Sequence, residues 1–248
     1  MALAPNAASK YAVEMYRKNP NAPAENITGS TAWANRITAT LENKGNSLVW
    51  TTSVDRTKAS TLTWTGQVDG NVDGTTLNWH NDGKGDFFAS EKDSLVFESR
   101  GNVWGVYNTD INFVGEVVKA SSITVRGASE GNSDYHRNYT FSGAAFELSG
   151  ANGFAHNTPD VFTWNAPTAG GTHKMDKFVS NYGGSGNRST LNLLGDHKFA
   201  PYSDKQLEFS LSGNHDAYIK GNITFERTDA DWSSKQYIDE NSTVTFTG

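Results

Sequence analysis

One short loop carries both the oxygen-bearing side chains and the spacing of a calcium-binding loop. In the run 69–74, Asp69, Asn71 and Asp73 occupy positions one, three and five, and a glycine follows at position six. Carboxylate and amide oxygens are the ligands that Ca²⁺ prefers, and the glycine permits the sharp turn of such a loop. Position twelve of the motif is a bidentate glutamate, but here it is His80. Asp69, Asn71 and Asp73 are therefore a candidate calcium site, with an ordinary Asp/Gly loop between two strands as the alternative.

Tryptophan is the second residue type that could bind a ligand, because an exposed indole ring can stack on a sugar. The chain has seven tryptophans. Trp64 and Trp164 end matching Leu-Thr-Trp and Phe-Thr-Trp runs, and the alternation of these runs predicts that both rings are buried. Trp104 and Trp232 lie in less regular surroundings, so they are the candidate residues of a binding surface.

The sequence contains no motif of a known catalytic or cofactor-binding site. None of the six histidines has the short spacing of a metal site. The Gly/Ser run at 183–186 is not a nucleophile elbow, and there is no phosphate-binding loop or dinucleotide fingerprint. A serine triad would be invisible in the sequence, since its members converge only in space. We expect a protein that is not an enzyme and binds no cofactor.

Composition excludes several further classes of site and partner. The chain of 248 residues has no cysteine, which excludes disulfides and zinc–thiolate sites. Its net charge is −6 and its basic residues are not clustered, which argues against nucleic acid as a partner. No apolar run approaches the roughly 18 residues of a transmembrane helix. The first residues lack the layout of a signal peptide, so either the protein is intracellular or the sequence is a piece of a longer one, and the internal repeats favour a piece.

The elements that must position these side chains are predicted to be strands with one helix in front. Asn6 can cap a helix from about residue 7 to 17, and prolines at 20 and 23 end it. After Asn26 short runs alternate apolar and polar residues, which is typical of half-buried strands. The predicted strands are 47–51, 61–65, 76–80, 95–98, 110–114, 122–125, 138–142, 145–148, 161–164, 190–194, 206–211, 222–226 and 243–247.

Two stretches of the chain repeat each other at an offset of 112 residues. Leu95 matches Leu207, and in the same alignment the run 110–113 matches 222–225. Such repetition is typical of a scaffold built by stacking similar modules. We therefore expect an all-β fold, a β-solenoid similar to a right-handed parallel β-helix, built of duplicated blocks behind a short N-terminal helix. Tandem β-sandwiches are the alternative. The expected units are a cap and linker at 1–45 and two repeat blocks at 46–160 and 161–248.

The repeated runs also resemble a known family. The stretch 61–66, the stretches 76–79 and 102–104, the run 110–113 and the closing 243–248 are similar to passenger regions of autotransporters. The likeness is to the repeated segments of the vacuolating-cytotoxin-like family of Helicobacter-type bacteria, and it covers about residues 45 to 248. The resemblance implies secretion through the outer membrane and a right-handed β-helix outside the cell. It offers no catalytic residues to carry over, and the N-terminal helix departs from it.

Together these features predict a non-enzymatic passenger fragment, secreted or exposed on the bacterial surface, that acts in adhesion or host colonisation. Its expected partners are a ligand or glycan of the host-cell surface, or copies of itself and neighbouring repeats. A virion protein that self-assembles, such as a tail, fibre or capsid component, is the second prediction. A β-helical polysaccharide lyase or hydrolase is the third, and it would need a row of charged residues on one face that the sequence does not reveal.

Overall fold

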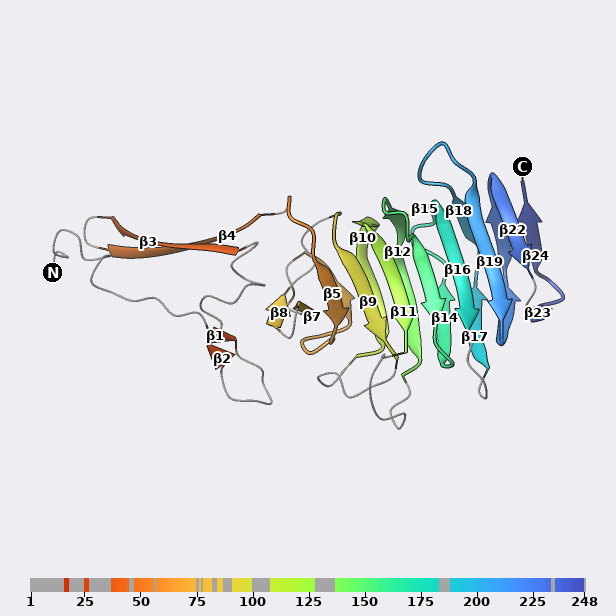
Figure 1. Cartoon of the computed structure of the whole chain (residues 1–248), viewed down its shortest axis with the longest axis horizontal. Helices are drawn as coiled ribbons and strands as arrows, with labels where there is room; N and C mark the ends of the chain where they lie inside the picture. Colours follow the sequence, from red (N-terminus) through yellow and green to blue (C-terminus); the bar gives the residue numbers. More distant parts are fainter. Residues whose placement is uncertain are drawn as a thin grey trace.

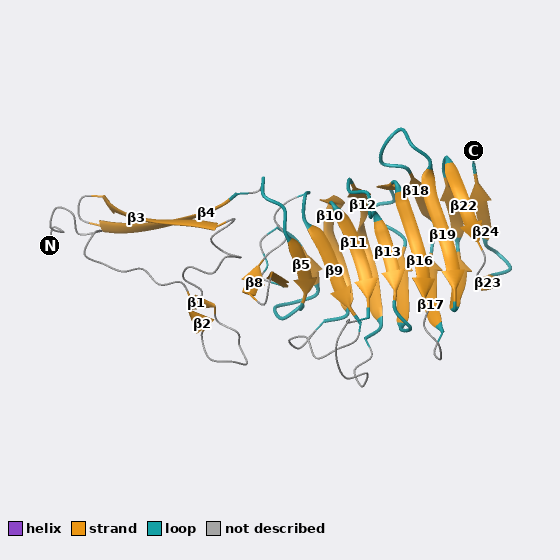
Figure 2. Cartoon of the chain, viewed as in Figure 1, coloured by secondary structure: helices purple, strands orange, loops and turns teal. Residues whose placement is uncertain are grey.

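The fold consists of strands throughout the part of the chain that the structure describes. The computed structural model describes residues 16–17, 25–26, 37–44, 47–55, 57–74, 76, 78–81, 84–86, 91–99, 108–127, 137–182, 188–232 and 235–247. These residues form two large sheets and two small two-stranded ones. Figure 2 draws the described elements as strands joined by loops, so the all-β prediction is confirmed.

The first large sheet has nine strands and forms one face of the molecule. In spatial order from β22 to β8, all neighbours from β22 to β5 are parallel, and β7 and β8 add antiparallel strands at the far edge. Its strands in chain order are β5 (Thr61–Trp64), β7 (Trp79–Asn81), β8 (Lys84–Asp86), β9 (Ser94–Glu98), β11 (Ser122–Arg126), β13 (Phe154–Asn157), β16 (Lys177–Tyr182), β19 (Leu207–Gly213) and β22 (Thr228–Trp232).

The second large sheet has eleven strands and contains two parallel ladders. The long strands β10 and β12 belong to both ladders, because the first half of β12 pairs with β14 and its second half with β15. Its strands are β6 (Asn71–Val72), β10 (Asp110–Ala120), β12 (Tyr139–Leu148), β14 (Val161–Asn165), β15 (His173–Met175), β17 (Ser189–Leu194), β18 (His197–Ala200), β20 (His215–Lys220), β21 (Asn222–Phe225), β23 (Lys235–Ile238) and β24 (Thr243–Phe246).

The chain visits the three ladders in turn and then starts the next coil. One coil is β16, β17 and β18, the next is β19, β20 and β21, and the last is β22, β23 and β24. Each strand pairs in parallel with the equivalent strand of the next coil. Figure 1 shows these coils side by side along one axis. This is a β-solenoid, as predicted; tandem sandwiches are wrong, because a sandwich is built of antiparallel strands.

Inward-facing side chains form columns that run from coil to coil. In the nine-stranded sheet one column joins Leu95, Ile123, Phe154, Phe178 and Phe209, and all five side chains are buried. The successive spacings along the chain are 28, 31, 24 and 31 residues. The rungs are aligned in space but the loops between them differ in length, so the sequence shows no regular period.

The repeat at an offset of 112 residues marks similar strands but not the register. Phe97 and Phe209 both lie buried in the nine-stranded sheet, as the repeat requires. However, the column of Leu95 passes through Phe209 and not through its sequence match, Leu207. The run 110–113 lies in the ladder of β14, whereas its match 222–225 lies in the ladder of β15. The match therefore reflects a shared pattern of alternation.

The N-terminal region differs from its prediction. The helix expected at 7–17 is wrong at its end, since β1 (Tyr16–Arg17) is a strand paired antiparallel with β2 (Glu25–Asn26). Residues 7–15 lie outside the described residues. A hairpin follows, formed by β3 (Ile37–Lys44) and β4 (Ser47–Val54). The unit boundaries at 45 and 160 stay predictions. No helix of the described part is long and apolar enough to span a membrane.

Candidate binding surface

The predicted calcium loop is held together by its own side chains. Oδ1 of Asp69 accepts hydrogen bonds from the backbone N–H of Asn71 at 2.8 Å and from Nδ2 of Asn78 at 2.7 Å. Asp73 accepts from the backbone N–H and the hydroxyl of Thr76 at 2.7 and 2.8 Å. Burial opposes the ionisation of Asp69, but the bonds from the two asparagines outweigh it and lower the pKa of its carboxyl.

These bonds explain the loop without an ion. The side-chain oxygen of Asn71 accepts a bond from Nδ2 of Asn112 at 3.0 Å, so all three candidate ligands have partners within the protein. Asx turns of this kind shape a loop between strands. The calcium site at Asp69, Asn71 and Asp73 stays a prediction, which a calcium titration followed by calorimetry tests.

The tryptophan predictions have different outcomes. Trp64 and Trp164 are each 1% exposed and belong to the core, as their alternation predicted. Trp104 lies outside the described residues. Trp232 ends β22, but its side chain lies outside the described part. The role of Trp104 and Trp232 in a binding surface therefore stays a prediction.

The interior holds a chain of polar groups that includes the residue types of a serine hydrolase. The hydroxyl of Ser180 lies 2.8 Å from Nδ1 of His156 and 2.6 Å from Nε2 of His215. Nearby, Thr158 bonds to Ser99 and donates to Asp160.

This row of buried polar side chains cannot contact a substrate in the conformation described. Ser180, His156 and His215 have no exposed surface. Burial lowers the pKa of His156 to about 3 and that of His215 to about 4, so both rings are neutral at pH 7. The arrangement pairs buried polar groups from three neighbouring coils, and we assign it a structural role.

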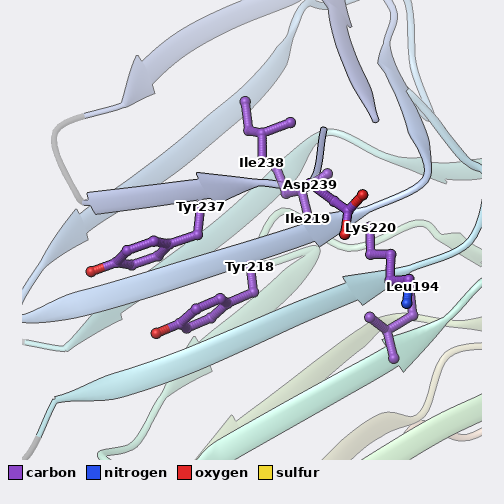
Figure 3. Close-up of a pocket in the computed structure, with 7 residues that line it drawn as sticks. All are labelled: Leu194, Tyr218, Ile219, Lys220, Tyr237, Ile238 and Asp239. Carbon is purple, nitrogen blue, oxygen red and sulfur yellow. The ribbon is translucent and has the colours of Figure 1, made fainter. Parts of the chain in front are cut away.

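An exposed aromatic pair lies on the outer side of the eleven-stranded sheet. Tyr218 on β20 and Tyr237 on β23 are register partners and are 41% and 45% exposed. Their ring centroids are 4.5 Å apart and their planes differ by 9°, so the rings stack in parallel (Figure 3). Exposed tyrosines present a rigid, amphipathic contact surface at low entropic cost, and they are enriched where proteins bind partners.

The tyrosines form one wall of a pocket of about 320 Å³. Lys220 at the end of β20, Asp239 after β23 and Leu194 at the end of the adjacent strand β17 form the opposite wall (Figure 3). Tyr218 and Lys220 point outward from one strand, and Ile219 between them points into the core and is 2% exposed. The pocket is therefore a groove that crosses three successive coils, through β17, β20 and β23. It offers aromatic surface on one side and one cation and one anion on the other.

A cluster of hydrogen bonds fixes the start of the strand that carries Tyr218. The guanidinium of Arg188 donates to both carboxylate oxygens of Asp216 at 2.6 and 2.7 Å. It also donates to the side chain of Asn214 and to the carbonyl of His215, each at 2.9 Å. The bond to Asp216 raises the pKa of Arg188. Bidentate pairs of this kind orient both partners, so the aromatic wall is attached to a well-anchored strand.

Reasoning from the sequence missed this groove because neither β20 nor β23 was predicted as a strand. A signal was nevertheless present. The dipeptide Tyr-Ile occurs at 218–219 and again at 237–238, followed each time by a charged residue. In a solenoid, such a repetition on alternating strands predicts an outward aromatic ladder beside an inward aliphatic one.

Comparison with known proteins gives no match to any family model, to any curated protein or to any solved structure. The function must therefore be argued from the surface of this molecule.

Proposed function

We propose that this chain is a non-enzymatic module of a bacterial passenger protein, secreted or exposed on the cell surface, that acts in adhesion or host colonisation. The stacked coils supply a rigid framework, and the ligand binds on the outside of it. The likeness of the repeated runs to autotransporter passengers supports this role, and so does the solenoid architecture. The ligand is a molecule of the host-cell surface, with glycans as one class.

The observation that carries the proposal is the groove at Tyr218 and Tyr237. The two tyrosines are 41% and 45% exposed although their rings stack, which leaves apolar surface in water beside Lys220 and Asp239. A concave site with apolar walls and few polar groups is the usual form of a ligand site. Aromatic residues at such positions supply a large part of the binding free energy of an interface.

Several charged side chains on the adjacent ladder, which runs through β12, β15, β18 and β21, are paired with one another. Glu147 accepts from Lys174 at 2.9 Å and lies 3.3 Å from Lys119. Lys198 lies 2.7 Å from Glu226. Exposed pairs of this kind contribute little to stability but neutralise each other, so they create no strongly basic or acidic field. This supports contact through the groove over attraction of a polyanion such as nucleic acid.

Binding of the fluorescently labelled chain to cultured epithelial cells tests the proposal. We expect saturable binding that Tyr218→Ala weakens by about tenfold, which corresponds to about 1.4 kcal/mol. Tyr202→Ala is the matched control, because Tyr202 is 46% exposed but lies outside the groove. Equal loss with both variants, or no saturable binding by the unaltered chain, would overturn the proposal.

A self-assembling virion protein is the second candidate. The stack of parallel coils favours it, because such a framework can serve as a structural scaffold. An open reading frame placed among phage structural genes would support this candidate, and absence of cell binding would then be expected.

A further inference from the structure

We propose that the groove binds an acidic glycan, with the anionic group of one sugar on Lys220 and the apolar face of that sugar against Tyr218. The inference rests on the proposed function, because it names the ligand class of the same groove. Tyr218 and Lys220 both lie on β20, which pairs with β17 on one side and with β23 on the other. Their exposure is therefore a property of the outer face of the sheet and not of an edge strand.

Lys220 is the cation of the groove whose charge is open to a ligand. Arg188 lies close enough to the aromatic pair to interact with both tyrosines, but its guanidinium is bound to both carboxylate oxygens of Asp216. Lys220 is exposed, and within the described ranges its ammonium group has no ion pair or hydrogen bond. Asp239 lines the same groove, but one of its carboxylate oxygens accepts from the backbone N–H of Asn241 at 3.3 Å.

The register of the strands explains why Lys220 differs from other lysines of the solenoid. In the nine-stranded sheet the register places Glu208 beside Lys177, and the two side chains form an ion pair at 2.7 Å. On β17 the register instead places Leu194 beside Lys220. An apolar neighbour excludes water from one side of the ammonium group, which strengthens its attraction for an anion. The groove therefore combines one uncompensated positive charge with apolar walls.

The size of the groove fits one sugar ring and its substituents. Tyr218 and Lys220 are two positions apart on the same side of one strand, so about 7 Å separates them along it (Figure 3). A sugar ring that carries an anionic group spans that distance. The volume of about 320 Å³ lies at the small end of the range of ligand sites, which is about 300–1,000 Å³. We therefore assign the groove to a single acidic sugar.

The position of the groove favours a glycan over a peptide. The backbone of β20 is paired with a strand on each side, so an extended peptide cannot join the sheet at Tyr218. A ligand must contact side chains alone. The ladder continues from Tyr218 to Asn192 and Thr163, whose side chains are bonded to each other at 3.0 Å. These uncharged amide and hydroxyl groups suit the hydroxyls of further sugars that lie along the solenoid axis.

Isothermal titration calorimetry with three soluble probes tests the ligand class. The probes are 3′-sialyllactose, which carries a carboxylate, 3′-sulfolactose, which carries a sulfate, and neutral lactose. We expect at least one acidic probe to bind about tenfold more tightly than lactose, because a charge-assisted bond to Lys220 is added. The tighter of the two acidic probes identifies the anionic group. Added salt should weaken the acidic probes and leave lactose unchanged.

Variants of the lysine assign the preference to the groove. Lys220→Met should abolish the difference between acidic and neutral probes, and Lys220→Arg should retain it. Lys198→Met is the matched control, since Lys198 is paired with Glu226 at 2.7 Å and does not line the groove. Circular dichroism verifies that each variant keeps its β structure. No binding of either acidic probe, an equal affinity for lactose, or a preference that survives Lys220→Met would overturn the proposal.

Cell binding separates a failure of this inference from a failure of the proposed function. If Tyr218→Ala weakens binding to epithelial cells but Lys220→Met does not, the groove binds a ligand that is not acidic, and only the ligand class is wrong. If the unaltered chain binds an acidic probe through Lys220 but shows no saturable binding to cells, the glycan site stands and the role in adhesion is wrong.

Discussion

Tyr218 stacks on Tyr237 with 4.5 Å between the ring centroids, because the register of two parallel strands brings together side chains from successive coils. The same pairing supports the groove and the geometry of the last coil. We expect the two rings to stabilise each other in the folded state by about 0.5–1.5 kcal/mol. A double-mutant cycle with Tyr218→Ala and Tyr237→Ala, measured by urea unfolding, gives this coupling. Strictly additive losses would show that the stacking contributes nothing.

The second prediction concerns the buried hydrogen bonds of Ser180. Its hydroxyl bonds to ring nitrogens of His156 and His215, so it donates to one ring and accepts from the other. Ser180→Ala leaves a buried polar atom on each ring without this partner, at a cost of about 1–3 kcal/mol for each. Ser210→Ala is the matched control, since Ser210 is only partly buried on a neighbouring strand and should change stability by at most about 0.5 kcal/mol. An equal loss of unfolding free energy in both variants would exclude a stabilising role for the hydrogen bonds of Ser180.

The third prediction is a loss of stability in acid. Burial lowers the pKa of His156 to about 3 and those of His197 and His215 to about 4, from an ordinary value of 6.5. As the pH falls, the unfolded chain binds protons first, so the stabilising contribution of these rings is present above pH 6.5 and is lost between pH 6.5 and about 4. Near pH 5 each ring lowers the free energy of unfolding by about 1.4 kcal/mol per pH unit.

A variant isolates the contribution of one ring. Nε2 of His197 lies 3.1 and 3.2 Å from two backbone carbonyls, and a glutamine amide can donate to the same oxygens. His197→Gln should therefore reduce the pH dependence by about one proton near pH 5. Urea unfolding at several pH values measures the slope. An unchanged slope would mean that His197 is already charged in the folded state.

The fourth prediction concerns a corner of the eleven-stranded sheet. Gly143 in β12 has a φ of +97°, and a Cβ at this position would lie 2.3 Å from the carbonyl oxygen of Phe113 on the adjacent coil. Gly115 in β10 has a similar φ of +113° but open space around it. Both alanine variants suffer the backbone strain, of about 1–3 kcal/mol. Only Gly143→Ala must also displace a neighbouring strand, so thermal unfolding should show a clearly larger loss for Gly143→Ala.

The sequence contained enough to predict the architecture because the inward columns impose a readable alternation. Strands with bulky apolar residues at every second position, such as β14 and β17, were predicted close to their bounds. The missed strands β15, β18 and β20 each begin with a buried histidine, at His173, His197 and His215. Histidine counts as a polar residue in a sequence pattern, but here neutral imidazole rings pack inside the solenoid. The alternation of inward apolar and outward polar residues in these strands was therefore not recognised.

The candidate groove was missed because its residues become neighbours only through register, although the repeated Tyr-Ile pair was a signal for it. Tyr218 and Tyr237 are separated by 19 positions, a spacing that belongs to one short coil and to no other pair of strands in that ladder. The calcium motif is a local pattern, and the site that it predicts stays a prediction. In the structure Asp69 and Asp73 use their oxygens to hold the loop.

The most direct test of the central claim is site-specific photo-cross-linking of the labelled chain on epithelial cells. A photoreactive phenylalanine analogue replaces Tyr218 in one variant and Tyr202 in another, since both positions are exposed but only Tyr218 lines the groove. We predict that the probe at Tyr218 captures a cell-surface molecule, whereas the probe at Tyr202 does not. Capture from Tyr202 alone, or equal capture from both positions, would contradict a binding site in the groove.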